Sequence, residues 1–249
     1  MPNGRVKAGT TLRVGYLSGD LKKHPVGFFL RAILRHHDRS QIYATCYHVG
    51  EGKDELTDVL KSTSDGWCEA NHLSNDELLH RIRRDNIDLL IDLCGHTDGN
   101  RASVITRRAA PVQAIYLGYP STSGLPNMDF VISDHHLSPP EYYNLYTQKV
   151  QRLEKCFLCF HPHEDAPPVA AAPCEKNGFV TFGSFNNLPK LSATTVKFWA
   201  IFYMRPLMQG WHSRRCPSSM LRHASCFTNT SWLMTLIIRE STCCHPPSR

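Results

Sequence analysis

The chain has 249 residues, of which 41% are hydrophobic and 20% charged, as in an ordinary globular protein. No apolar run reaches the about 18 residues that a membrane-spanning helix needs, and the N-terminus lacks the apolar segment of a secretory signal. We therefore expect a cytoplasmic or nuclear protein without a membrane partner. The formal charge of +6 lies almost wholly in residues 201–249, so the nearly neutral remainder does not indicate a nucleic-acid partner.

Strand-like and helix-like segments alternate along the first 200 residues. Short apolar runs predict strands at 12–19, 41–50, 87–95, 111–120, 128–134 and 149–160. Apolar residues at helical spacing predict helices at 26–37, 54–64 and 74–85. The last of these opens with Ser74 and Glu77, which are spaced as a capping box. Strands that alternate with helices predict an α/β fold with a parallel sheet covered by helices.

The composition changes after the last predicted strand. Residues 161–178 are rich in Pro and Ala and are interpreted as a linker, and 179–200 contain a predicted strand (179–186) and helix (192–200) that would begin a second unit. Residues 201–249 contain no Lys, no Asp and one Glu, and they have no clear periodicity. We expect this part to be an aberrant, poorly ordered tail and residues 1–11 to be disordered.

Ten cysteines without a secretory signal indicate reduced thiols rather than a disulfide framework. One cluster contains residue types that bind zinc: Cys156, Cys159, His161, His163 and Cys174. No second CxxC motif completes it, and in a strand over 149–160 the first two thiols would lie on opposite faces. Buried and loop thiols are the favoured interpretation, and no metal site is predicted.

Polar or glycine-rich loops follow three of the predicted strands. Asp20 and His24 follow the first strand, His96 follows the strand at 87–95, and the stretch 116–124 follows the next. Ligands of open α/β sheets bind at the carboxyl ends of the strands, and histidine can transfer a proton or donate a hydrogen bond near neutral pH. The simpler alternative is that Asp20 caps the next helix and His24 lies at the surface.

The sequence contains no Asp-x-Asp, so a carboxylate pair that would hold a divalent cation on a diphosphate is not indicated. Phosphate charge would then be balanced by a side-chain cation or by backbone N–H groups. Lys190 follows the predicted strand at 179–186 and is a compact charge suited to that role. An ordinary strand, loop and helix would explain the same stretch.

Four stretches together resemble the catalytic region of the protein O-GlcNAc transferases and of the related plant Spindly-type protein O-fucosyltransferases: LRVGYLSGDLKKHPVG, IDLLIDLCGHTDGNR, RRAAPVQAIYLGYPSTSGLPNMDFVISD and VTFGSFNNLPKLS. The similarity runs from about Leu12 to Ala200. It implies a GT-B glycosyltransferase, with residues 12–160 as a Rossmann-like N-terminal catalytic lobe and a truncated second, nucleotide-binding lobe that starts at 179–200. It also implies inverting, metal-independent transfer of N-acetylglucosamine from UDP-GlcNAc to Ser or Thr of intracellular acceptor proteins, with no cofactor.

The resemblance also implies roles for single residues. His24, followed by Pro25, matches the active-site histidine of the family, and Asp20 matches an aspartate discussed as a base. Lys190 matches the lysine that neutralises the departing diphosphate. The remaining implied substrate contacts are the loop against the sugar and the amide beside the lysine: Leu117, Gly118, Tyr119, Pro120 and Asn187. His96 is a further substrate-binding candidate from its place at a strand end.

Two alternatives stay open at this point. Because most nucleotide-binding residues of the family lie in the second lobe, the chain could be a folded lobe without turnover. For the same reason the donor could carry fucose, as in the Spindly type.

Overall fold

The computed structural model describes residues 10–163, 165–172, 175–176, 182–184, 188–208 and 234–236. The chain divides into two compact units, Met1–Ala166 and Pro167–Arg249. The strands of the first unit are β1 (Leu12–Ser18), β2 (Ile42–His48), β3 (Gly66–Glu69), β4 (Leu89–Asp92), β5 (Val112–Ile115), β6 (Phe130–Ser133) and β7 (Lys149–Arg152). Its helices are α1 (Pro25–His36), α2 (Glu55–Thr63), α3 (Asn75–Arg84), α4 (Ala102–Ile105) and the 3-10 helix η1 (Pro140–Leu145).

The seven strands form one sheet in the order β3-β2-β1-β4-β5-β6-β7, and every pairing is parallel. From β1 the chain builds outward to β3, returns to the middle as β4, and builds outward again to β7. The direction therefore reverses between β1 and β4, and in sheets of this kind ligands bind at the carboxyl ends of the strands beside such a reversal. The predicted Rossmann-like α/β lobe is confirmed.

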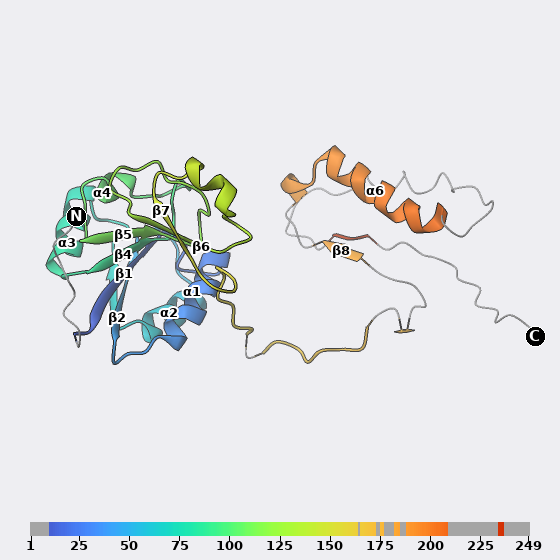
Figure 1. The fold of residues 1–249 in the computed structure, drawn as a ribbon. Coiled ribbons are helices and arrows are strands. Elements are labelled where there is room, and N and C mark those ends of the chain that lie inside the picture. Colours follow the sequence, from blue (N-terminus) through green and yellow to red (C-terminus); the bar gives the residue numbers. More distant parts are fainter. Residues whose placement is uncertain are drawn as a thin grey trace, which may run out of the picture. The chain divides into compact units, whose positions relative to one another are not determined.

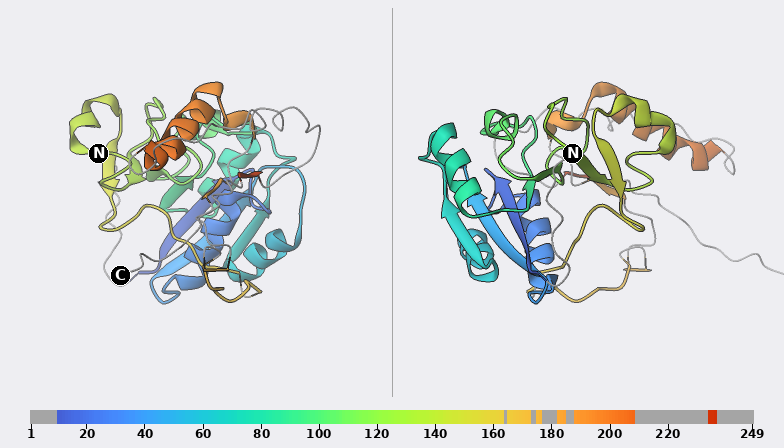
Figure 2. Two further views of the ribbon diagram at one scale, coloured as in Figure 1. Left: turned by 90° about the vertical axis from the view of Figure 1, so that its right-hand side faces the viewer. Right: turned by 60° about the vertical axis from the view of Figure 1, so that its left-hand side comes forward.

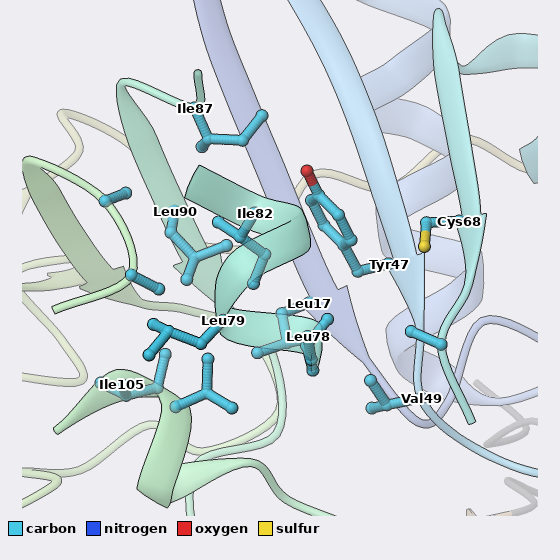
Figure 3. Packing of buried hydrophobic residues seen from close by; sticks show 14 of the residues in the cluster. Leu17, Tyr47, Val49, Cys68, Leu78, Leu79, Ile82, Ile87, Leu90 and Ile105 are labelled. Atoms are coloured by element: carbon cyan, nitrogen blue, oxygen red, sulfur yellow. The ribbon is translucent and has the colours of Figure 1, made fainter. Parts of the chain in front are cut away.

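Helices cover both faces of this sheet (Figure 1; further views in Figure 2). On one face α1 and α2 pack through fully buried leucines such as Leu30, Leu34 and Leu60. On the other face the apolar side of α3 packs on the strands, and Figure 3 shows Leu78 and Ile82 among the strand residues that they contact. Each such buried side chain contributes about 1.5–3 kcal/mol.

The helix boundaries follow from their caps. The capping box predicted for α3 is confirmed: Glu77 N–H donates to Oγ of Ser74 at 3.3 Å, and Ser74 N–H donates to the Glu77 carboxylate at 2.8 Å. A second capping box, between Asp54 and Thr57, begins α2. Both satisfy N–H groups that have no partner within their helix.

Two predictions about strands were wrong. β3 was missed because its sequence, Gly-Trp-Cys-Glu, forms no apolar run. The strand predicted at 149–160 ends at Arg152, and the chain then turns back toward α1. There Phe157 N–H donates to Asp134 at 2.8 Å, and the ring of Phe160 packs on that of Phe29 with 6.2 Å between centroids. These tertiary contacts replace the expected pairing.

The second unit contains β8 (Phe182–Ser184), the 3-10 helix η2 (Leu188–Lys190), α6 (Ala193–Met208) and β9 (Met234–Leu236). β8 and β9 pair antiparallel. Helix α6 continues eight residues beyond the predicted end at Ala200, and β9 lies in the segment expected to be an aberrant tail. Among the described residues, no helix combines the length and apolar character needed to cross a bilayer.

Candidate functional site

Three loops that follow β1, β4 and β5 lie together at the carboxyl ends of these neighbouring strands. The loops are in close contact, in each case at a glycine. Gly19 N–H donates to Sγ of Cys94 at 3.3 Å, which joins the β1 and β4 loops. A methyl group added at Gly118 would lie 1.9 Å from the carbonyl oxygen of Leu93, so the β4 and β5 loops are in direct contact. Only a residue without a side chain fits at Gly118.

His24 is the N-cap of α1. Its Nδ1 accepts a hydrogen bond from Val26 N–H at 3.3 Å, and Pro25 occupies the first position of the helix. Proline is favoured there because its missing N–H would have no partner. The alternative prediction that Asp20 caps this helix is therefore wrong. The His24 side chain stays 42% exposed, so it is available to a ligand.

The hydrogen bond to His24 defines what its ring can do. Because Nδ1 accepts from Val26, the proton of the neutral imidazole lies on Nε2. Oδ2 of Asp20 lies 3.7 Å from Nδ1, which is beyond hydrogen-bond distance. In this arrangement His24 is a hydrogen-bond donor through Nε2, and Asp20 is a nearby negative charge rather than its hydrogen-bonded partner.

His96 and Tyr119 join the β4 and β5 loops. Nε2 of His96 donates to the carbonyl oxygen of Ser123 at 2.6 Å, and its ring meets that of Tyr119 edge-on, with centroids 5.2 Å apart. Gly95 makes this contact possible: its φ is +58°, and a Cβ there would lie 2.3 Å from the Cβ of Tyr119. The structure thus brings together these two predicted substrate contacts.

The loop that contains Leu117, Gly118, Tyr119 and Pro120 has a tight turn at its start. Gly118 N–H donates to the carbonyl oxygen of Tyr116 at 2.8 Å, and Leu117 has a φ of +58°. A side chain in this left-handed region costs roughly 1–2 kcal/mol, and such strain is concentrated at functional sites. Leu117 is buried and Pro120 is exposed. The turn therefore fixes which residues of the loop face outward.

Asp92, at the end of β4, was missed by the sequence analysis. Its carboxylate accepts from the N–H groups of Cys94 and Gly95 at 3.0 and 3.1 Å, and burial raises its pKa to about 6. The available signal was a carboxylate inside the apolar run at 87–95. Because Asp92 occupies these N–H groups, and those of Gly118 and Gly124 bond within their own loop, these amides are not open to a phosphate.

The remaining predicted residues follow the first unit in the sequence. Lys190 is exposed in η2 of the second unit, and Asn187 lies outside the described residues. In the part of the chain that the structure describes, no group of three or more His, Cys, Asp or Glu residues could hold a metal ion. Cys156 and Cys159 lie beyond β7, so the prediction that they project from opposite faces of a strand was wrong.

A comparison with known families identifies the fold and its loops. Residues 1–165 match the family described as glycosyl transferase family 41. The chain belongs to that family. The match includes every element of the parallel sheet and the three loops at its carboxyl ends, so the predicted resemblance is confirmed.

Family 41 relatives include a protein from Arabidopsis thaliana named as a probable UDP-N-acetylglucosamine–peptide N-acetylglucosaminyltransferase, SPINDLY. It is 36% identical over 193 residues, which are 76% of this chain and 21% of that protein. A UDP-N-acetylglucosamine–peptide N-acetylglucosaminyltransferase from Caenorhabditis elegans is 34% identical over 156 residues, 61% of this chain and 14% of that protein. The chain thus spans about a fifth or less of the curated relatives named here.

A solved structure also resembles the chain. It is a mutant O-GlcNAc transferase from Thermobaculum terrenum, with a TM-score of 0.74 and 38% sequence identity. The similarity covers 81% of this chain and 38% of that one.

Proposed function

We propose that this chain is part of the catalytic region of a protein glycosyltransferase that transfers N-acetylglucosamine from UDP-GlcNAc to Ser or Thr of cytoplasmic or nuclear proteins. The observation that carries the proposal is the convergence of three loops, with His24, His96 and Tyr119, at the carboxyl ends of β1, β4 and β5 in a family 41 lobe. The transfer would invert the anomeric centre and would use no metal or cofactor.

In the proposed reaction, the first unit contributes a hydrogen-bond donor and a turn against the sugar rather than charged groups. His24, with its proton on Nε2, would donate to an oxygen of the donor or acceptor, and the Leu117–Pro120 turn would lie against the sugar. The backbone N–H groups of Cys94, Gly95 and Gly118 already have partners. The departing diphosphate would therefore depend on a side-chain cation, and Lys190 is proposed for that role. A positioned cation of this kind acts mainly on the transition state.

The direct test is transfer of radiolabelled N-acetylglucosamine from UDP-GlcNAc to peptides that contain Ser and Thr. We expect product from the full chain, and a rate about 100–1,000-fold lower for Lys190→Ala. Lys197→Ala is the matched control, because this lysine is also exposed but lies on α6. Equal rates for the two variants would remove Lys190 from the mechanism.

Calorimetric titration with UDP separates the alternatives. A chain that binds neither UDP nor GDP and transfers no sugar would be a folded lobe without turnover, and the proposed function would be wrong for this polypeptide. Transfer from GDP-fucose in place of UDP-GlcNAc would instead assign the Spindly-type fucosyl reaction. Incubation with a chelator should leave either rate unchanged.

A further inference from the structure

The loop between β1 and α1 is fastened to the start of α2. Lys23 N–H donates to Oδ2 of Asp54 at 2.6 Å, and the buried hydroxyl of Thr57 donates to the carbonyl oxygen of Leu21 at 2.8 Å. The ammonium group of Lys23 also pairs with the carboxylate of Glu55 at 2.5 Å. These contacts join two segments that are more than 30 residues apart in the sequence.

Asp54 divides its two oxygens between two tasks. Oδ1 caps α2 by accepting from the N–H groups of Leu56 and Thr57 at 3.0 and 3.1 Å. Among the described residues, Oδ2 accepts from Lys23 alone, in the loop. A helix cap needs one side-chain oxygen, so the second bond goes beyond what capping requires. A bond from a backbone N–H to a carboxylate is also stronger than one to a neutral acceptor.

The N-cap of α3 has the same kind of capping box as that of α2. Ser74 forms it with Glu77, but the bonds of both side chains stay within the box. The loop after β4 contacts the start of α3 through Asn75 rather than through its two cap side chains, whereas at α2 the cap residue Asp54 itself binds a loop.

We propose that Asp54 is a positioning residue for His24, a role that rests on the function proposed above. Lys23 directly precedes His24, whose own N–H donates to the carbonyl oxygen of Lys22 at 2.6 Å. Because Asp54 holds the amide of Lys23, the backbone conformation of His24 at the start of α1 is fixed. Val26 N–H then fixes Nδ1, and the Nε2–H group is aimed by these two constraints together.

The decisive variant is Asp54→Asn, because asparagine keeps an oxygen for the cap and replaces the other by an NH2 group that cannot accept from Lys23. Asp54→Ala removes both bonds. Ser74→Ala removes a cap of the same type far from His24 in the sequence and is the matched control. The tautomer of the His24 ring can be measured from its ring nitrogen chemical shifts, in the full chain labelled at its histidines. The variant His24→Gln identifies which signals belong to His24.

We expect Asp54→Asn to move the two ring nitrogen shifts of His24 toward each other, as a mixture of tautomers replaces the single one, while Ser74→Ala leaves them unchanged. In the transfer assay Asp54→Asn should lower kcat about 10–100-fold, as expected for a misplaced group, with KM for the donor changed less. Unchanged His24 shifts in a folded Asp54→Asn protein would overturn the proposal.

The spectroscopic reading does not depend on turnover, so a chain without activity would contradict the proposed function and leave the position of His24 measurable. If Asp54→Asn fails to fold, Thr57→Val is the second variant, because it removes both the bond to Leu21 and the hydroxyl that accepts from the N–H of Asp54. Thr57→Ser should restore the His24 shifts of the unmodified protein. Identical shifts in Thr57→Val and the unmodified protein would count against the proposal.

Discussion

The loops at the two ends of the parallel sheet are held in different ways. At the amino ends, side chains join the loops. Arg108 binds both carboxylate oxygens of Asp129 at 2.6 and 3.0 Å, and the buried amide of Gln113 donates to the carbonyl oxygens of Ile105 and Asn127 at 2.9 and 2.7 Å. At the carboxyl ends, side-chain bonds such as that of His96 to Ser123 are joined by close packing at Gly118 and Gly95, and Asp92 fixes only its own loop.

This difference has a consequence for function. A side chain that holds two loops together is not available to bind a ligand. At the carboxyl ends, the packing of Gly118 on the Leu93 carbonyl and of Gly95 on the Tyr119 side chain supplies part of the attachment, and His24 and Pro120 stay partly or fully exposed. The carboxyl ends can therefore present chemistry to a ligand, while the amino ends contribute stability.

The largest effect is expected from Gly118→Ala. Because the new Cβ would lie 1.9 Å from a backbone oxygen, one of the two loops must move, and we expect a loss of at least about 3 kcal/mol in the free energy of unfolding. Urea unfolding measures it. Gly124→Ala is the control: its φ is +66° but nothing lies within 4 Å, so it should cost only about 1 kcal/mol. Equal losses would contradict the close packing of the loops.

Asp92→Asn tests the buried carboxylate through pH. The folded-state pKa of Asp92, about 6, lies above the ordinary value of 3.8, because burial disfavours the charged form. Folding therefore favours the protonated acid. The stabilisation is complete below about pH 4 and is lost as the pH rises through about 6, and its total is about 3 kcal/mol at most.

We therefore expect the stability of the unmodified protein relative to Asp92→Asn to fall by up to about 3 kcal/mol between about pH 4 and pH 7.5. Urea unfolding of both proteins across this range measures it. His37 and His48, whose pKa values burial lowers, contribute the opposite slope to both proteins and cancel in the difference. A difference that stays constant or grows with pH would show that Asp92 is ionised at no cost.

Arg108→Ala tests the amino ends and should have the smallest effect. The pair with Asp129 is bidentate but partly exposed, with side-chain exposures of 34% and 25%, so we expect a loss of about 1–2 kcal/mol in urea unfolding and no change in transfer activity. Arg107→Ala is the control, because its partner Asp76 is largely exposed; its loss should stay below about 1 kcal/mol. A loss of activity in Arg108→Ala would undermine the division between the two ends.

Much of the fold could be predicted because local patterns carry it. The apolar runs that became β1, β2 and β4 and the helical spacing in α1 and α3 were identified to within one to three residues. β3 could not be predicted because Gly-Trp-Cys-Glu forms no apolar run, and the end of β7 could not because apolar residues continue beyond Arg152. In both cases, pairing with a neighbouring strand decides whether the strand forms.

The candidate site, like the fold, could be predicted from the sequence only in part. The sequence by itself determined the residue types and their order: a histidine before a proline after the first strand, glycines after the fourth and fifth, and a parallel sheet that would bring these loops to one side. Only the tertiary structure decided that His24 caps α1 with its proton on Nε2, that Asp92 occupies the loop amides, and that Asp54 holds the Lys23 amide. The bond from Lys23 to Asp54 joins segments 31 residues apart, and no local propensity encodes a partner at that distance. The bonds of His24 and Asp92 span two or three residues, and the packing of their loops decides whether they form.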